Sequence, residues 1–318
     1  MSKHSVTSPL RRILSAIFLL LVGSAALSGQ ATMVETGSPT DPAIHAKLGL
    51  PVPANPKLPT LFLVGDSTVR NGRGDGAGGQ WGWGEPLTEF FDPTTINVVN
   101  RAIGGRSSRT YITEGHWADT LALMKRGDIV LLQFGHNDSG PLDDTARARG
   151  TLPGVADDSR EIENPILKRH ENVHSYGWYM RQYVADTLAK GAMPIVCSPI
   201  PRKIWKDGNV VRNTDNYGGW ARQVAAQQHV GFIDLNEIIG RRYDVLGQTS
   251  VEPLFADPHT HTSRAGAELN AEAVVSGLKA LPNNPLASYL SQKGRDVTLP
   301  SERVAHKRTG LGLSSGCG

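Results

Sequence analysis

The chain has 318 residues, a hydrophobic content of 39%, 35 glycines and a formal net charge of +3. This length suits one large domain or two small ones, and the glycine content suits a globular α/β protein with many loops. The net charge is too small to indicate a nucleic-acid-binding protein, and no basic run strengthens that case. We therefore expect no nucleic-acid partner, although a local basic patch that faces an acidic substrate is compatible with this composition.

The amino-terminal residues have the features of a secretory signal peptide. A basic start that includes Lys3 precedes an apolar run over residues 13–27, and a plausible cleavage signal ends at Ser28. The apolar run is too short to span a bilayer comfortably, so an uncleaved membrane anchor is the less favoured alternative. We predict a signal peptide over residues 1–31 and a secreted or periplasmic protein without membrane contact after cleavage.

Composition divides the rest of the chain into three parts. Residues 32–57 are rich in proline and poor in large apolar residues, which predicts a linker that lies over the domain. Residues 58–281 contain the apolar runs of one folded domain. Residues 282–318 carry few large apolar groups, so we predict a flexible carboxyl-terminal tail.

The sequence contains two cysteines, Cys197 and Cys317, which are too few for a disulfide framework. Cys197 ends an apolar run and is therefore expected to be a small core residue. The sequence leaves the role of Cys317 and the oligomeric state open.

Apolar runs alternate with segments long enough to form crossover helices. The predicted strands are residues 61–64, 96–99, 129–134, 193–197 and 232–235. The predicted helices are residues 85–91, 117–125, 176–190, 217–229 and 264–280. This alternation indicates a five-stranded parallel sheet covered on both faces. Right-handed crossovers then give a three-layer α/β/α sandwich of the flavodoxin-like type.

Residues 138–170 do not fit this alternation, because they are charged and only weakly periodic. A loop of this length in a compact domain is usually functional or disordered. The segment follows the third predicted strand, so we expect it to lie over the carboxyl edge of the sheet. There it would influence the choice of substrate.

A polar cluster follows each of the first three predicted strands. Gly65-Asp66-Ser67 follows the first strand, a glycine pair that includes Gly105 follows the second, and Gly135-His136-Asn137-Asp138 follows the third. The carboxyl ends of parallel strands share one edge, which is where open α/β folds place their active sites. We therefore expect these clusters to converge, together with the stretch from Asp257 to His261 before the last predicted helix.

This set of residues is what acyl transfer requires. Ser67 would be the nucleophile, and a serine hydroxyl needs a base within hydrogen-bond reach. His261 could accept the proton, and Asp257 could hold the imidazole in the right tautomer. The backbone N–H groups of Ser67 and Gly105 and the side-chain amide of Asn137 would form the oxyanion hole.

These four blocks, in this order, resemble the SGNH hydrolases, also called GDSL esterases. Finer features resemble the rhamnogalacturonan acetylesterase branch: Gly65-Asp66-Ser67-Thr68, Gln80-Trp81-Gly82-Trp83-Gly84, Asn100-Arg101-Ala102-Ile103-Gly104-Gly105-Arg106-Ser107, Gln133-Phe134-Gly135-His136-Asn137-Asp138 and His259-Thr260-His261-Thr262. The resemblance covers about residues 60–280. It implies a carboxylic ester hydrolase that uses no metal or other cofactor and removes acetyl groups from pectic polysaccharide. Acetylated rhamnogalacturonan, homogalacturonan and xylan all remain possible substrates.

The last block departs from the family pattern, which places an aspartate three residues before the histidine. Position 258, three residues before His261, is a proline, and Asp257 lies four residues before it. Asp257 could still reach His261 around a turn. His259 is the alternative base.

A metal-dependent hydrolase is the first alternative function. The candidate ligands His136, Asp138, Asp257, His259 and His261 all belong to the blocks expected at the same edge. Such a site would make Ser67 incidental, but it would leave the Gly105 and Asn137 blocks unexplained.

A carbohydrate-binding protein without catalysis is the second alternative. Trp81 and Trp83 follow a glycine-rich loop beside the predicted nucleophile, and we assign both as candidate sugar-stacking residues. Trp178 and Trp220 lie in predicted helices, so core packing is the better interpretation for them.

Cationic residues also follow the predicted strands, namely Arg106, Arg109, Arg202 and Lys203. Guanidinium groups recognise carboxylates by paired hydrogen bonds, which would suit galacturonate. Ordinary surface charge is the simpler interpretation, so we do not assign these residues to the site.

Overall fold

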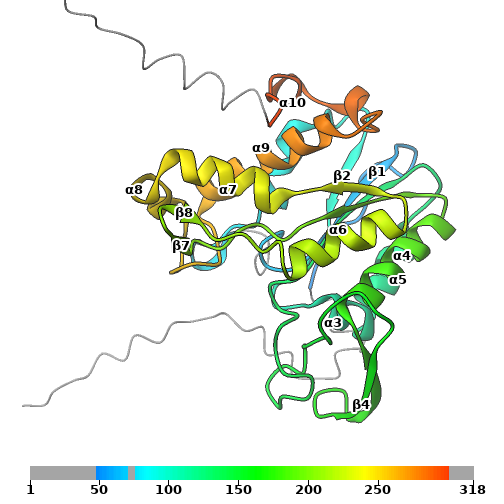
Figure 1. The fold of residues 1–318 in the computed structure, drawn as a ribbon. Coiled ribbons are helices and arrows are strands. Elements are labelled where there is room, and N and C mark those ends of the chain that lie inside the picture. Colours follow the sequence, from blue (N-terminus) through cyan, green and yellow to red (C-terminus); the bar gives the residue numbers. More distant parts are fainter. Residues whose placement is uncertain (1–47, 71–75, 301–318) are drawn as a thin grey trace, which may run out of the picture. The chain divides into compact units, whose positions relative to one another are not determined.

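The computed structural model describes residues 48–70 and 76–300 (Figure 1). Its centre is a five-stranded sheet with the order β2-β1-β3-β6-β9. The strands are β1 (Thr60–Gly65), β2 (Asn97–Asn100), β3 (Ile129–Gln133), β6 (Met193–Cys197) and β9 (Gly231–Ile233). Every neighbouring pair is parallel. The predicted parallel sheet and its flavodoxin-like order are confirmed.

Alternate residues of each strand face opposite sides of the sheet, and each side has its own helices. Leu61 and Leu63 of β1 pack in one core with α2 (Gly84–Leu87), α7 (Leu235–Leu246) and α9 (Arg264–Ala280). Phe62 and Val64 pack in a second core. The helices of that core are α3 (Ser108–Thr113), α4 (His116–Leu123), α5 (Tyr176–Ala189) and α6 (Tyr217–Gln227). The sheet therefore lies between two helical layers, as predicted (Figure 1).

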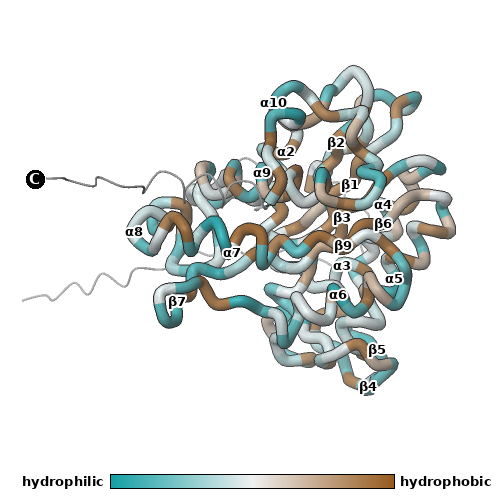
Figure 2. The backbone as a smooth tube through the Cα atoms, turned by 45° about the horizontal axis from the view of Figure 1, so that its top comes forward, coloured by the Kyte–Doolittle hydropathy of each residue, from teal (hydrophilic) through white to brown (hydrophobic). Residues whose placement is uncertain are grey.

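Hydropathy follows the same layering. The tube in Figure 2 is mostly brown along β1, β3 and β9, and hydrophilic residues gather on the outer turns. Cys197 at the end of β6 is a free, fully buried thiol, which confirms its predicted place in the core. Within the part of the chain that the structure describes, no helix has both the length and the apolar character to cross a bilayer.

Two helices of the layers, α7 and α3, differ from the sequence prediction, and both begin at capping residues. The side chain of Asp234 accepts a hydrogen bond from the backbone N–H of Glu237 at the start of α7. Ser107 and Thr110 form a reciprocal capping box at the start of α3. Asp234, three residues before Glu237, is a helix-start signal, although the apolar run over residues 232–235 predicts a strand there.

Short elements complete the described chain. They are η1 (Ala77–Gly79), η2 (Thr88–Phe90), β7 (Trp205–Lys206), β8 (Asn209–Val210), α8 (Gln248–Val251), η3 (Glu252–Leu254), η4 (Ala287–Tyr289) and α10 (Gln292–Arg295).

The long charged segment after β3 contains an antiparallel hairpin that the sequence analysis did not predict. Its strands are β4 (Ser159–Asn164) and β5 (Arg169–His174). Glu171 of β5 accepts two hydrogen bonds, at 2.7 and 2.8 Å, from the fully buried guanidinium of Arg109 in α3. The hairpin is thus attached to the domain through a buried ion pair, which hydrophobic periodicity does not reveal.

The prediction of a flexible tail is wrong for residues 282–300. Leu286, Leu290 and Val297 are 0, 4 and 5% exposed and belong to the core that contains α9. Ser291 donates a backbone hydrogen bond of 3.0 Å to the carbonyl of Phe90. These three apolar side chains anchor an otherwise polar stretch. Because they are few and widely spaced, the sequence pattern did not predict that the stretch is ordered. Residues 301–318, including Cys317, lie outside the described residues.

The predicted signal peptide also lies outside the described residues, as does the linker up to residue 47. Residues 48–57 follow the domain surface. The backbone N–H of Asn55 donates to the side chain of Asn97 at 3.0 Å, and the carbonyl of Pro51 accepts from Arg101 at 3.1 Å. This part of the predicted linker does lie over the domain.

Leu286→Ala tests whether residues 282–300 stabilise the fold. We expect a loss of about 2–5 kcal/mol in the free energy of unfolding, because the substitution leaves a cavity in the core. Leu188 is 50% exposed, so Leu188→Ala should change that free energy by less than about 0.5 kcal/mol. Urea denaturation of both variants measures the difference. Equal, small effects would mean that this segment is dispensable for stability.

Candidate active site

Ser67 lies in a tight turn directly after β1. The backbone N–H groups of Val69 and Arg70 both donate to the carbonyl of Asp66, at 3.1 and 2.9 Å. Gly65 leaves room for this turn, since a Cβ there would lie 2.6 Å from Val69 Cγ2 and 2.5 Å from the carbonyl oxygen of Gln133 in β3. Ser67 is thus held at the carboxyl edge of the sheet, where the sequence predicted it.

Ser67, His261 and Asp257 form a continuous hydrogen-bonded chain. Ser67 Oγ lies 2.8 Å from His261 Nε2, and His261 Nδ1 lies 2.5 Å from Asp257 Oδ2. An ionised carboxylate only accepts hydrogen bonds, so we assign the ring proton to Nδ1. Nε2 is then left without a proton and can accept the one carried by the serine hydroxyl.

The four-residue spacing between Asp257 and His261 is accommodated by a turn built around the aspartate. Asp257 Oδ1 accepts hydrogen bonds from the backbone N–H groups of His259, Thr260 and His261, at 3.0, 2.6 and 3.0 Å. The turn is closed by the N–H of Ala256, which donates to the His261 carbonyl at 2.9 Å. The extra residue therefore does not separate the carboxylate from the imidazole.

The same contacts keep Asp257 ionised. Burial raises the pKa of its carboxyl group, but the hydrogen bonds from Thr260 and from the ring and backbone of His261 outweigh this effect. The net result is a pKa below the ordinary value for aspartate. A charged Asp257 can therefore both orient His261 and stabilise its protonated form.

The alternative base and the alternative metal site find no support in the geometry. His259 is exposed, and its Nδ1 contacts Thr260 Oγ1 at 2.6 Å. His136 Nε2 lies 3.1 Å from the carbonyl oxygen of Ile200. Over residues 48–70 and 76–300, no three His, Cys, Asp or Glu side chains form a group that could hold a metal ion.

The predicted oxyanion-hole residues follow three neighbouring strands. Gly105, after β2, has a φ of +80°, a left-handed conformation that favours glycine. Asn137, after β3, donates a hydrogen bond of 2.9 Å from Nδ2 to the carbonyl of Arg106. This bond fixes which end of the amide is the nitrogen and leaves its second hydrogen available. Ser67 follows β1, which lies between β2 and β3.

Asp138 has a structural role that the sequence analysis missed. Its Oδ1 accepts hydrogen bonds from the backbone N–H and the hydroxyl of Ser108, at 3.0 and 2.5 Å. Burial raises the pKa of Asp138 to about 7, although the bonds from Ser108 lower it. Asp138 thereby joins the Asn137 loop to the first turn of α3. From the sequence, its carboxylate was recognised only as a candidate metal ligand.

The prediction that Trp83 binds sugar is wrong, because its side chain belongs to the core and is 1% exposed. Its indole N–H donates to Gln133 Oε1 at 2.9 Å, and Gln133 Nε2 donates to Thr68 Oγ1 at 2.7 Å. The Thr68 hydroxyl donates in turn to Asp66 Oδ1 at 2.7 Å. Trp83 therefore supports the turn that carries Ser67, and the pattern of tryptophans could not distinguish this role from sugar binding.

Asp66 completes this buried network. Its Oδ2 lies 3.4 Å from His136 Nδ1. Burial raises the pKa of Asp66, but the nearby His136 and the hydrogen bonds from Thr68 outweigh it and hold the pKa below the ordinary value. A buried anion thus lies beneath the turn of the serine and beside the loop of Asn137.

Trp81 lies next to the histidine loop. Its backbone N–H donates to the carbonyl of Thr262, and the hydroxyl of Thr262 donates to the carbonyl of Trp81, both at 2.8 Å. The guanidinium carbon of Arg264 lies 5.2 Å from the centre of the indole ring. The ring is partly exposed, so its assignment as a sugar-stacking residue stays a prediction.

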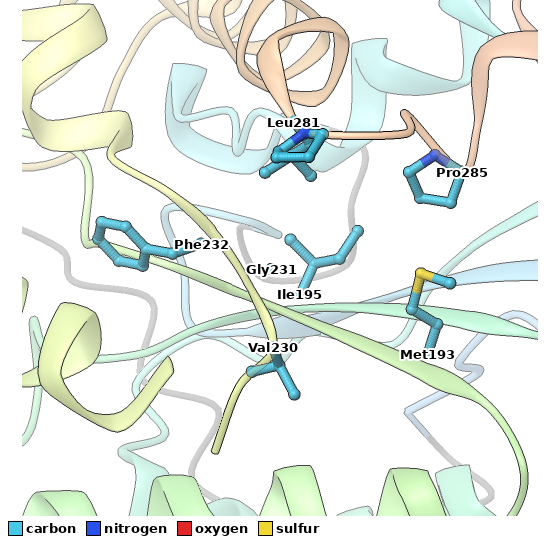
Figure 3. Close-up of a pocket in the computed structure, with 8 residues that line it drawn as sticks. Met193, Ile195, Val230, Gly231, Phe232, Leu281 and Pro285 are labelled. Atoms are coloured by element: carbon cyan, nitrogen blue, oxygen red, sulfur yellow. The ribbon is translucent and has the colours of Figure 1, made fainter. Parts of the chain in front are cut away.

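An apolar hollow lies elsewhere on the sheet (Figure 3). It is lined by residues of β6 and β9, such as Met193 and Phe232, and by Leu281, Pro282 and Pro285. None of its lining residues has a polar side chain, so this hollow supplies no catalytic group. The candidate catalytic groups lie instead at the carboxyl edge around Ser67.

Comparisons with known proteins point to the same chemistry. Residues 63–269 match the family model described as "GDSL-like Lipase/Acylhydrolase family". The chain is 29% identical over 220 residues to a rhamnogalacturonan acetylesterase of Emericella nidulans, covering 69% of this chain and 84% of the relative. It is 31% identical over 226 residues to YesY of Bacillus subtilis, a probable rhamnogalacturonan acetylesterase, covering 70% and 93%.

A solved structure supports the fold. The crystal structure of the YxiM protein of Bacillus subtilis aligns with a TM-score of 0.56 and 25% sequence identity. The alignment covers 70% of this chain and 56% of the YxiM chain, so the present chain spans little more than half of that protein.

Proposed function

The chain belongs to the GDSL-like lipase/acylhydrolase family and is a carboxylic ester hydrolase of the rhamnogalacturonan acetylesterase-like branch; from this premise we propose that it is an exported serine esterase. It removes O-acetyl groups from plant cell-wall polysaccharide by way of an acyl-enzyme on Ser67. The single observation that carries this proposal is the hydrogen-bonded chain from Ser67 Oγ through His261 to Asp257, at 2.8 and 2.5 Å.

The first half-reaction transfers the acetyl group to the enzyme. Ser67 Oγ attacks the acetyl carbonyl carbon while its proton passes to His261 Nε2. The negative charge on the carbonyl oxygen is stabilised by the N–H groups of Ser67 and Gly105 and by the second Nδ2 hydrogen of Asn137. When the tetrahedral intermediate collapses, His261 gives its proton to the departing sugar oxygen.

The second half-reaction regenerates the serine. Water attacks the acetyl carbonyl of the acyl-enzyme and transfers a proton to His261 Nε2. Collapse of the second tetrahedral intermediate releases acetate, and His261 returns the proton to Ser67 Oγ. Asp257 keeps its hydrogen bond to Nδ1 throughout and remains ionised.

Pectic rhamnogalacturonan is the substrate we propose, and three observations support it. Both relatives described above carry the name rhamnogalacturonan acetylesterase, YesY as a probable one. The partly exposed indole of Trp81 lies beside the His261 loop, where it could stack on a sugar ring. The amino-terminal sequence has the features of a secretory signal, which would bring the enzyme to an extracellular polymer.

Acetate release from three substrates tests the proposal. Acetylated rhamnogalacturonan, acetylated xylan and p-nitrophenyl acetate should each be incubated with the wild type and with Ser67→Ala. Release that depends on Ser67 and is fastest from rhamnogalacturonan is the expected result. Serine-dependent release from the small ester alone would remove the pectic assignment. Release that survives Ser67→Ala would contradict the acyl-enzyme mechanism.

Asn137→Ala tests the oxyanion hole separately. Removal of one donor to the oxyanion should lower kcat by about a hundred- to a thousand-fold with a small change in KM. Asn209→Ala removes an exposed amide on β8 and should leave kcat unchanged. Steady-state kinetics with p-nitrophenyl acetate give both constants. A rise in KM with unchanged kcat would instead place Asn137 in substrate binding.

A further inference from the structure

Three of the four cationic side chains noted in the sequence are neutralised within the protein. Arg106 Nε lies 2.8 Å from a carboxylate oxygen of Glu114, and the buried Arg109 pairs with Glu171 at 2.7 Å. Lys203 Nζ lies 2.6 Å from Glu252. These pairs leave little charge for a ligand.

Arg149 differs from these cations. It lies in the segment before the β4–β5 hairpin, and its Nη1 donates a 3.1 Å hydrogen bond to the carbonyl of Gly105. The guanidinium lies over Gly105, since a Cβ on that glycine would be 3.9 Å from Nη1. Among the described residues no carboxylate forms an ion pair with Arg149. Burial lowers the pKa of Arg149, which reflects incomplete solvation of the cation.

Arg202, which follows β6, is the second such cation. Its Nη2 donates a 3.2 Å hydrogen bond to the carbonyl of His136, next to Asn137. The next residue, Lys203, donates from its backbone N–H to the carbonyl of His259 at 2.8 Å, which holds this segment against the histidine loop. Arg202 is partly buried, and no carboxylate in the described chain pairs with it.

The strand order places these two cations on opposite sides of the nucleophile. Gly105, with Arg149 above it, follows β2, and Ser67 follows β1. The loop of His136 follows β3, and Arg202 follows β6. Three interstrand spacings separate β2 from β6, which together amount to about 14 Å. A chain of several sugar units laid along this edge could therefore meet both guanidinium groups while its acetyl ester meets Ser67.

We propose that Arg149 and Arg202 are specificity-determining residues that bind uronate carboxylates on either side of the scissile acetyl ester. Each guanidinium uses one nitrogen on a backbone carbonyl, which fixes its position, and has further N–H donors for a ligand. A planar guanidinium matches a carboxylate with paired, charge-assisted hydrogen bonds. This inference rests on the proposed acetylesterase function and adds that these two residues recognise the carboxylates of the acetylated chain.

The wild-type enzyme provides the first test. Acetylated rhamnogalacturonan oligosaccharides and the same oligosaccharides with methyl-esterified carboxyl groups differ only in the charge and the methyl group at each carboxyl. We expect kcat/KM for acetate release to be about ten- to a hundredfold higher for the free acid, because hydrogen bonds to charged groups are the strong ones. Added salt should reduce this preference, since it screens the partly exposed cations.

Variants then assign the preference to the two arginines. Arg149→Gln and Arg202→Gln should each lower the ratio of kcat/KM for the free acid to that for the methyl ester by about tenfold. Arg149→Lys keeps the charge without the planar group, so it should retain part of the preference for the free acid. Arg126→Gln is the matched control, since Arg126 precedes β3 and packs against Gly191 at the opposite edge of the sheet. It should keep the wild-type ratio.

The outcomes separate this inference from the function on which it rests. Equal wild-type rates on the free acid and the methyl ester would overturn the carboxylate clamp and leave the serine esterase intact. A preference that persists in both glutamine variants would also overturn it. Acetate release that is independent of Ser67 would instead overturn the proposed function. Should one glutamine variant fail to fold, the other variant and the wild-type salt dependence still decide.

Discussion

Ser67→Ala is expected to lower kcat for acetyl-ester hydrolysis by about ten-thousand- to a million-fold, because the variant cannot form the acyl-enzyme. The residual rate should come from the oxyanion donors and from substrate binding alone. His261→Ala should lose nearly as much, since the hydroxyl of Ser67 then has no base at the 2.8 Å contact. The double variant should be no slower than either single variant, because the two residues act as one unit.

These rates are measured with p-nitrophenyl acetate, whose first turnover shows a burst of p-nitrophenol if the acyl-enzyme accumulates. The burst should disappear in Ser67→Ala, while the unfolding midpoint stays close to that of the wild type. His259→Ala and Ser288→Ala are matched controls, because both side chains are exposed and neither contacts Ser67. Wild-type turnover in Ser67→Ala or in His261→Ala would contradict the mechanism.

The sequence predicted the sheet and its functional edge because both depend on short-range patterns. The apolar run over residues 193–197 matches β6, and the polar clusters at Ser67 and Asn137 follow strand ends as expected. Parallel pairing then brings distant parts of the chain together without further information. His261 joins them from the loop before α9.

Other features depend on partners that are distant in the sequence. The role of Trp83 is set by Gln133, and the β4–β5 hairpin is attached through the pairing of Arg109 with Glu171. Neither partnership has a local signature. The same is true of Leu286, whose burial requires the surface formed by α9. Sequence patterns therefore located the chemistry but not the side chains that support it.

The charge state of Asp257 makes the free energy of unfolding depend on pH in the acidic range. Its folded-state pKa lies below the ordinary value of about 4, so its ionised form stabilises the fold above that pH. That contribution is lost as the pH falls through the folded-state value. The difference in unfolding free energy between the wild type and Asp257→Asn should therefore narrow on acidification from pH 7 to about pH 3.

Asp257→Asn should lower kcat by about a thousand- to ten-thousand-fold, less than the loss in Ser67→Ala or His261→Ala. Three backbone N–H groups point at Oδ1, so the amide oxygen of the variant should occupy that position. The NH2 group of the variant would then donate a hydrogen bond to His261 Nδ1. Nδ1 can accept that hydrogen bond only when it carries no proton. The ring proton would move to Nε2, and His261 could no longer accept the proton of Ser67.

The imidazole 15N chemical shifts of His261 distinguish the two tautomers directly, and kinetics with p-nitrophenyl acetate give the rate. Asp207→Asn, on an exposed turn, is the matched control and should change neither. A normal tautomer with a large loss in kcat would mean that Asp257 acts through its charge alone. A loss as large as that of His261→Ala would make the carboxylate as important as the base itself. A normal tautomer with an unchanged rate would contradict the orienting role that the 2.5 Å contact indicates.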